Sequence, residues 1–329
     1  MLNNKTILIT GGTGSFGKKF LEMIFAQYKP KKVIIYSRDE YKQSVMKTEY
    51  ADKVDMSRVR FFIGDVRDKE RMYRAFTGVD YVIHAAAMKQ VPTCEYNPME
   101  AIKTNIHGAQ NVIDAALDCG VKKVVALSTD KAVNPINLYG GTKLVSDKLF
   151  IAANAYRGNN YNTVFSVVRY GNVAGSRGSV IPIWKNIIAN GGTTLGVTDM
   201  RMTRFWITLQ QGVELVFKAL SESAGGETYI SKIPSFHIGD LAKAMLSECK
   251  IDEFGIREGE KLHEVMITKD DSFTTYEYDK HYIIYPHYDW WDGSILPGGT
   301  LVEEGFEYNS GNNKEWLDVE ALKQALELM

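Results

Sequence analysis

The octapeptide Thr10-Gly11-Gly12-Thr13-Gly14-Ser15-Phe16-Gly17 decides the fold that this sequence predicts. It follows the apolar run Ile7-Leu8-Ile9 and precedes a helix-length stretch, so it joins a strand to a helix at the start of the chain. Three of its four glycines fall at positions 11, 14 and 17, a wider spacing than the usual Gly-x-Gly-x-x-Gly. Glycines here allow a tight turn and bring backbone N–H groups close to a pyrophosphate at the helix N-terminus. An isolated match would carry little weight, but this position predicts a dinucleotide site.

Short apolar runs alternate with helix-length segments through the first half of the chain. The helical segments include Gly17–Ala26 and Asn105–Cys119. Such alternation indicates βαβ units, and two halves of three strands each make the doubly wound Rossmann arrangement. We therefore predict an α/β fold, a doubly wound parallel sheet with a smaller substrate-binding cap. The six predicted strands are Thr6–Thr10, Val33–Tyr36, Val59–Ile63, Tyr81–His84, Val124–Ser128 and Val164–Arg169.

The alternation of strands and helices stops after about residue 175. We expect residues 1–175 to form the dinucleotide-binding domain, with the catalytic residues included. Residues 176–329 are expected to form mainly the cap, with an approximate boundary and a chain interleaved between the two parts. The aromatic segment Tyr276–Trp291 predicts exposed or edge β structure. A final amphipathic helix is expected over Val319–Leu328.

Composition excludes several classes of protein. The chain has 329 residues, enough for a large core, and a net charge of −1 gives no reason to expect nucleic acid or an anionic membrane as a partner. No apolar run approaches the ~18 residues of a membrane helix. Cys94, Cys119 and Cys249 are scattered and odd in number, which favours a reduced, cytoplasmic protein. The six histidines do not cluster, so no metal is expected.

The end of the second predicted strand favours NADP over NAD. An NAD site usually has Asp or Glu there, whereas this chain has Ser37 and Arg38. Ser37 can donate a hydrogen bond to a 2′-phosphate, and Arg38 can pair with it. Asp39 and Glu40 follow directly and keep NAD open. The residues expected at the cofactor are Gly11, Thr13, Gly14, Ser15, Phe16, Gly17, Ser37, Arg38, Lys42, Asp65, Val66, Ala85, Ala86, Tyr139 and Lys143.

The predicted chemical core gathers Thr129, Asp130, Lys131, Tyr139 and Lys143 within a short stretch. Tyr139 and Lys143 are four residues apart and share one face of a helix. A free tyrosine has a pKa of about 10, and a neighbouring ammonium lowers it toward the phenolate that acts as a base. The spacing alone arises often by chance, but the glycine loop and Thr129 at a strand end favour a catalytic pair.

Several segments together resemble the extended short-chain dehydrogenase/reductase superfamily, and within it the inverting UDP-N-acetylglucosamine 4,6-dehydratases that begin the route to pseudaminic acid-type sugars. The resemblance runs from Thr6 to about Lys269 and weakens through Asp270–Gly305. Gln90 and Gly141 stand where His and Ala would be expected. Beyond the glycine loop and the Tyr/Lys pair, the segments are Ser37–Glu40, His84–Lys89, Ser128–Ala132, Asn134–Gly140, Val168–Val173, Asp199–Trp206 and Gly255–Glu264.

The resemblance implies a lyase that removes water from UDP-N-acetylglucosamine, giving a UDP-2-acetamido-2,6-dideoxy-L-arabino-hex-4-ulose. Tyr139, helped by Lys143 and Thr129, would take the C4 hydroxyl proton while hydride leaves C4. Lys131, as a neutral amine, would remove the C5 proton, and Asp130 would protonate the departing C6 hydroxyl. Hydride would return to C6, and C5 would be reprotonated from the opposite face.

The resemblance also implies a substrate side and an assembly. Lys89 would lie near the sugar pyrophosphate and Asn172 at a diphosphate oxygen. Arg204 and Arg257 would pair with phosphates, for which guanidinium is suited. Glu260 would accept hydrogen bonds from the uridine ribose. Members of this superfamily usually pair through helices of the Rossmann domain, so a homo-oligomer is expected.

Three alternatives stay open from the sequence. A C5-retaining dehydratase would differ in the stereochemical outcome at C5. A UDP-sugar 4-epimerase needs Thr129, Tyr139 and Lys143 but no acid and amine at the next two positions. A non-catalytic NADP-binding regulator needs none of these groups together.

Lys131→Ala is therefore expected to lose water elimination, because the amine that removes the C5 proton is gone. The measurement is formation of the 6-deoxy product from UDP-N-acetylglucosamine. Full activity in this variant would remove Lys131 from the mechanism.

Overall fold

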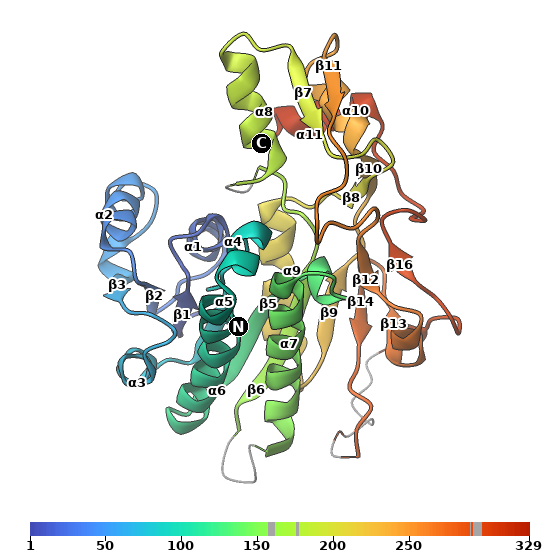
Figure 1. The fold of residues 1–329 in the computed structure, drawn as a ribbon. Coiled ribbons are helices and arrows are strands. Elements are labelled where there is room, and N and C mark those ends of the chain that lie inside the picture. The colour runs from blue at the N-terminus through green and yellow to red at the C-terminus, as the bar shows by residue number, and fades with distance from the viewer. Residues whose placement is uncertain (157–161, 176–177, 290, 292–297) are drawn as a thin grey trace.

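A ten-stranded sheet forms the centre of the protein (Figure 1), with the order β15-β13-β14-β9-β6-β5-β4-β1-β2-β3. The structure is a computed structural model that describes residues 1–329 except 157–161, 176–177, 290 and 292–297. The first six strands match their predicted ranges within one residue at either end, and their parallel order confirms the doubly wound α/β fold. These strands are β1 (Thr6–Thr10), β2 (Lys32–Ser37), β3 (Val59–Ile63), β4 (Tyr81–His84), β5 (Lys123–Thr129) and β6 (Val164–Tyr170).

Helices cover both faces of the sheet because its strands are apolar on both sides. In β1, Ile7 and Ile9 enter one core while Leu8 enters the other. The first core is closed by α1 (Ser15–Gln27) and α9 (Leu209–Glu222). The second is closed by α3 (Lys69–Phe76), α6 (Gly108–Asp118) and α7 (Leu138–Tyr156). The remaining helices near the sheet are α2 (Glu40–Glu49), α4 (Val91–Tyr96), α5 (Pro98–Ile102) and a π-helical turn at Lys103–His107.

The later chain extends the sheet. Strand β9 (Thr228–Ser231) pairs parallel to β6, and the next strand, β14 (His281–Ile284), runs antiparallel to it. Beyond β14 lie β13 (Thr275–Glu277) and β15 (Thr300–Leu301). The prediction of β structure in Tyr276–Trp291 is confirmed for β13 and β14, but its exposed or edge position is wrong for β14, which is mostly buried between β9 and β13, and β15 forms the edge beyond β13. Trp290 lies outside the described residues.

A second lobe stands beyond the carboxyl ends of the parallel strands (Figure 1). Its core is built around Trp184, Trp206, Phe236 and Leu322. The chain after residue 175 therefore supplies this lobe and also part of the large sheet; the division into two domains at that point stays a prediction. The lobe contains α8 (Val180–Ala189), β7 (Thr194–Val197), β8 (Thr203–Phe205), β10 (Ser235–His237), α10 (Ile238–Met245), β11 (Lys250–Glu253) and α11 (Val319–Glu327), and beside it β12 (Val265–Ile267) pairs with β16 (Tyr308–Asn309). None of the described helices is long and apolar enough to cross a membrane.

Helix α7 approaches the turn after β5 unusually closely. Strand β5 ends at Thr129 and passes into a short helical turn at Asp130–Ala132. A Cβ atom placed on Gly140 would lie 2.0 Å from the carbonyl oxygen of Lys131, closer than any real contact. On the adjacent Gly141 it would meet nothing within 4 Å. The missing side chain at Gly140 thus lets the helix that carries Tyr139 lie against the turn that carries Asp130 and Lys131.

Gly140→Ala is expected to lower the free energy of unfolding by about 1–3 kcal/mol, because the helix or the turn must shift to relieve the overlap. Urea-induced unfolding measures this change. Gly141→Ala is the matched control, and its free energy of unfolding should stay the same or rise by up to about 1 kcal/mol, since alanine is the better helix former. Equal effects of the two substitutions would contradict the close approach.

Candidate active site

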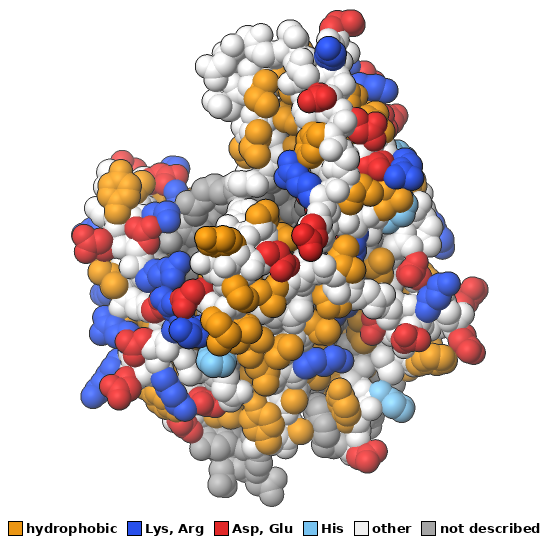
Figure 2. All heavy atoms as spheres, viewed as in Figure 1, with side chains coloured by type: hydrophobic (Ala, Val, Ile, Leu, Met, Phe, Trp, Pro, Cys, Tyr) orange, Lys and Arg blue, Asp and Glu red, His pale blue; other side chains and the backbone are white. Residues whose placement is uncertain are grey.

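A cavity of about 1170 Å³ lies at the carboxyl ends of the parallel strands and extends to the upper lobe. Figure 2 shows the molecule hollowed between the edge that carries α2 and the lobe that carries α8. The cavity is lined by every residue proposed from the sequence for cofactor, catalysis and substrate except Gly17. Gly17 instead packs beneath the loop, where an added Cβ would lie 2.2 Å from the carbonyl oxygen of Gly12.

The glycine loop packs closely against the backbone that follows β4 and ends at the start of α1. Gly11 has a φ of +64°, and a Cβ on it would lie 2.9 Å from the backbone of Ala86. Gly14 is the N-cap of α1 and, within the described residues, no side chain caps that helix, whereas Asp39 and Asp68 cap α2 and α3. The first N–H groups of α1 are therefore not used by a side chain and suit an anion such as a pyrophosphate.

The end of β2 presents a hydroxyl and two cations to the cavity. The Ser37 hydroxyl accepts a hydrogen bond from Nε2 of the buried Gln43 (3.0 Å), so its own proton is left to donate. Nη1 of Arg38 lies 3.7 Å from Oδ2 of Asp65, and Nζ of Lys42 lies 2.6 Å from Oδ2 of Asp39. Gln43 was not among the residues predicted from the sequence, because an amide on a helix carries no signal of its partner.

Asp65 is already bound on both carboxylate oxygens. Arg67 donates from Nε to Oδ1 (3.1 Å) and from Nη2 to Oδ2 (2.7 Å). Burial raises the pKa of Asp65, but the hydrogen bonds and charge of Arg67 outweigh burial, and the pKa lies below its usual value. A ligand that donates a hydrogen bond to this carboxylate would therefore share it with Arg67.

Tyr139 and Lys143 are buried at the centre of the site. Burial raises the pKa of Tyr139 to about 12, while the charge of Lys131 and a hydrogen bond with Thr129 lower it. Burial lowers the pKa of Lys143, and the charge of Asp147 opposes this. Of the charges around the phenol, Lys131 lowers its pKa most, whereas Lys143 was expected from the sequence to do so.

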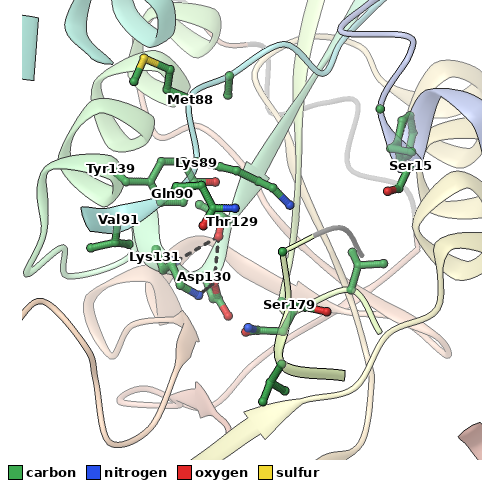
Figure 3. A pocket seen from close by; sticks show the side chains of 18 of the residues that line it. Ser15, Met88, Lys89, Gln90, Val91, Thr129, Asp130, Lys131, Tyr139 and Ser179 are labelled. Atoms are coloured by element: carbon green, nitrogen blue, oxygen red, sulfur yellow. Dashed lines mark hydrogen bonds and ion pairs between the residues drawn. The ribbon is translucent and has the colours of Figure 1, made fainter. Parts of the chain in front are cut away.

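Lys131 lies between two carboxylates. Its Nζ is 3.1 Å from Oδ1 of Asp130 and 3.2 Å from Oε1 of Glu264. Oδ1 of Asp130 also accepts a hydrogen bond from the Thr129 hydroxyl (2.8 Å; Figure 3). Burial lowers the pKa of Lys131, but Asp130 and Glu264 outweigh it, and the pKa ends above its usual value. Lys131 is thus an ammonium in the resting site, which differs from the neutral amine expected from the sequence.

Asp130 is suited to hold a proton. Its side chain is fully buried, and Oδ2 has no hydrogen-bond partner in the described part of the chain. Burial and then the charge of Glu264 raise the pKa of Asp130, while Lys131 and Thr129 lower it less. A carboxyl group with a raised pKa is the usual form of a general acid.

The residues proposed for substrate binding differ in how far their side chains are exposed to solvent. Lys89, Asn172 and Arg257 are exposed, and the Arg257 guanidinium lies 4.7 Å from the centre of the Phe254 ring. Oε2 of Glu260 is buried and, among the described residues, has no hydrogen-bond donor, so a ligand hydroxyl would satisfy it.

Arg204 is bound by the protein itself. Its Nη1 donates to the carbonyl oxygens of Thr203 (2.7 Å) and Leu262 (3.2 Å), and its Nε lies 3.6 Å from Oε1 of Glu264. Its side chain is only 13% exposed. The guanidinium expected to pair with a phosphate is therefore also part of the charged group around Lys131.

Two cavity residues, Lys261 and Glu264, had no role predicted from the sequence. Lys261 donates from Nζ to the carbonyl oxygen of Val133 (2.5 Å). Glu264 and Lys131 are 133 positions apart, and no local spacing connects them.

The described residues contain no group of three or more His, Cys, Asp or Glu side chains that could hold a metal ion.

Comparison with known proteins finds relatives over almost the whole chain. The family described as "Polysaccharide biosynthesis protein" matches residues 7–286. The UDP-N-acetylglucosamine 4,6-dehydratase (inverting) of Campylobacter jejuni subsp. jejuni serotype O:23/36 (strain 81-176) is 55% identical over 96% of this chain and 95% of that protein. The UDP-glucose 4-epimerase of Rickettsia canadensis (strain McKiel) is 44% identical over 99% of this chain and 96% of that protein.

A solved structure has the same fold throughout. Pen from Bacillus thuringiensis superposes with a TM-score of 0.90 and 39% identity, over 100% of this chain and 99% of that one.

Proposed function

This chain belongs to the polysaccharide biosynthesis protein family, and we propose that it is an inverting UDP-N-acetylglucosamine 4,6-dehydratase. The observation that carries the proposal is the presence of Asp130 and Lys131 in the same cavity as Tyr139 and Lys143. The Tyr/Lys pair is suited to removing the hydroxyl proton of an alcohol that is oxidised, and the Asp/Lys pair is suited to removing water from the neighbouring carbons.

The cavity fits a nicotinamide dinucleotide, and we propose NADP. The start of α1, which no side chain of the described residues caps, suits the pyrophosphate. Ser37, Arg38 and Lys42 offer a hydroxyl proton and two positive charges for a 2′-phosphate. When bound, the nicotinamide supplies reversible hydride transfer.

The residues of the chain move the protons. Tyr139 accepts the C4 hydroxyl proton in its phenolate form as C4 becomes a ketone, and the charge of Lys131 and the hydrogen bond with Thr129 favour that form against the effect of burial. Lys131 then takes the C5 proton, and the electron pair of the C5–H bond forms the enolate of the ketone. The enolate expels the C6 oxygen, Asp130 gives that oxygen a proton, and water leaves with a C5=C6 double bond in place.

Asp130 and Lys131 share the single proton that this sequence of steps needs. Movement of the proton from Nζ of Lys131 to Oδ1 of Asp130, across 3.1 Å, creates a neutral amine and a carboxylic acid. These are the base for C5 and the acid for the C6 oxygen. No proton has to enter from solvent before elimination.

The alternatives explain fewer of the observations. A 4-epimerase needs no Asp/Lys pair beside the Tyr/Lys pair, although a 44% identical relative is named a UDP-glucose 4-epimerase. A C5-retaining dehydratase fits the residues equally well but not the names of the 54–55% identical relatives. A regulator needs neither pair.

We further propose that the protein works in the cytoplasm as a homo-oligomer and serves a route to pseudaminic acid-type sugars. Its three free cysteines suit a reducing compartment. The assignment of residues 1–175 to cofactor binding and of most later residues to substrate binding belongs to the same proposal.

Incubation with UDP-N-acetylglucosamine in deuterated water, followed by proton NMR, tests this function. A new C6 methyl signal, deuterium at C5 and an L-arabino coupling pattern are expected. The D-xylo pattern would indicate C5 retention, and UDP-N-acetylgalactosamine without a methyl group would indicate an epimerase. Absence of turnover with any UDP-sugar would support the regulator instead.

Arg38→Ala is expected to weaken NADPH binding roughly tenfold, since a charged hydrogen bond to the 2′-phosphate is lost, and to leave NADH binding unchanged. Fluorescence titration with each nucleotide measures both constants. Arg74→Ala, on the exposed side of α3 outside the cavity, is the control. Equal weakening of NADH and NADPH would argue against a role of Arg38 at the 2′-phosphate.

A further inference from the structure

Glu264 reaches Lys131 from a distant part of the chain. It lies just before β12, and its side chain is 3% exposed. Oε1 lies 3.2 Å from Nζ of Lys131 and 3.6 Å from Nε of Arg204. Oε2 is buried without a hydrogen-bond partner among the described residues. A second buried carboxylate, with one oxygen unpaired among the described residues, therefore lies in contact with Lys131.

The backbone of Glu264 is held on both sides. Its N–H donates to the hydroxyl of Ser310 (2.9 Å), and its carbonyl oxygen accepts from the N–H of Ser310 (2.8 Å). The Ser310 hydroxyl in turn lies 2.7 Å from that of Thr203, which precedes Arg204 in β8. Both charged neighbours of Lys131 on this side thus come from one hydrogen-bonded unit, and the carboxylate has little freedom to move.

A purely structural role does not explain two carboxylates at one ammonium. Asp130, at 3.1 Å, already balances the charge of Lys131. Burying a second carboxylate costs free energy unless it is compensated, and here Arg204 supplies the compensation. These four side chains, Asp130, Glu264, Lys131 and Arg204, have no net charge only while Lys131 is protonated or has passed its proton to Asp130.

We propose that Glu264 is a positioning residue for the dehydratase reaction: it holds the Lys131 nitrogen toward C5 of the sugar and stabilises the ammonium that forms there. The inference rests on the proposed function. When Lys131 has given its proton to Asp130, the amine still donates an N–H to Glu264, which leaves the nitrogen lone pair free. When the lone pair takes the C5 proton, the C5–H electron pair stays on the sugar, and Glu264 balances the new positive charge.

The charged groups around Lys131 determine how loss of the Glu264 charge changes the pH profile of elimination. Asp130 faces Nζ from the same turn, Arg204 from β8 and Tyr139 from α7, and Lys261 acts on Glu264. Burial and Arg204 lower the pKa of Lys131, whereas Asp130 and Glu264 raise it. Loss of the Glu264 charge therefore lowers the pKa of Lys131 and makes the amine a weaker base.

The test is a single-turnover measurement on Glu264→Gln with UDP-N-acetylglucosamine, followed in two channels. Absorbance of the reduced nicotinamide reports oxidation at C4, and the methyl product with solvent deuterium at C5 reports elimination. Oxidation at C4 should change less than about threefold, while elimination should slow by up to about a hundredfold. The rising limb of the pH profile for elimination should move to lower pH, because loss of the Glu264 charge lowers the pKa values of Asp130 and Lys131 and the pair reaches its one-proton form at a lower pH.

Two further variants separate charge from structure. Glu264→Asp keeps the charge but shortens the side chain, so elimination should slow while the pH limb stays near that of the unaltered protein. Glu227→Gln removes another buried carboxylate, one that accepts N–H groups of Ala224 and Gly225 outside the cavity, and should leave the pH limb in place.

An equal loss of both steps in Glu264→Gln, or a pH limb that does not move, would overturn the role of Glu264. Failure of the unaltered protein to oxidise C4 or to form the methyl product would instead refute the proposed function.

Discussion

The ammonium of Lys131 lies between the carboxylates of Asp130 and Glu264, and the arrangement of the site depends on this one charge. Its charge acts to lower the pKa of both Asp130 and Tyr139, and Glu264 links it to Arg204. The absent side chain of Gly140 lets α7, which carries Tyr139, lie against the turn that carries Asp130 and Lys131. The turn that carries Asp130 and Lys131 is therefore held in place both by its close packing against α7 and by the ion pairs of Lys131.

The site combines two kinds of chemistry that a fold of this type can carry separately. The glycine loop, Thr129, Tyr139 and Lys143 form the part suited to oxidation at one carbon. Asp130, Lys131 and Glu264 form the part suited to moving a proton to and from the neighbouring carbons. Because Lys131 touches the acid and also acts on the phenol, the two parts are electrostatically coupled.

Local patterns in the sequence predicted much of this arrangement. The six parallel strands and the cavity positions of the glycine loop, Tyr139 and Lys131 follow from periodicity, turn residues and strand ends, all of which act over a few residues. The resting proton on Lys131, the partner of Arg204 and the place of Glu264 were not predicted. They arise from contacts across as many as 133 positions, which depend on how the later chain folds back over the sheet. The extension of the sheet by β13 to β15 has the same origin.

The claim that one cavity removes hydride and then water is tested most directly with UDP-N-acetylglucosamine carrying deuterium at C4, in ordinary water. Mass spectrometry and NMR of the product locate the label. Deuterium in the C6 methyl group, as CH2D, is the predicted result, since hydride leaves C4 and returns to C6 of the same sugar. Deuterium that stays at C4, or is lost to solvent, would contradict the account.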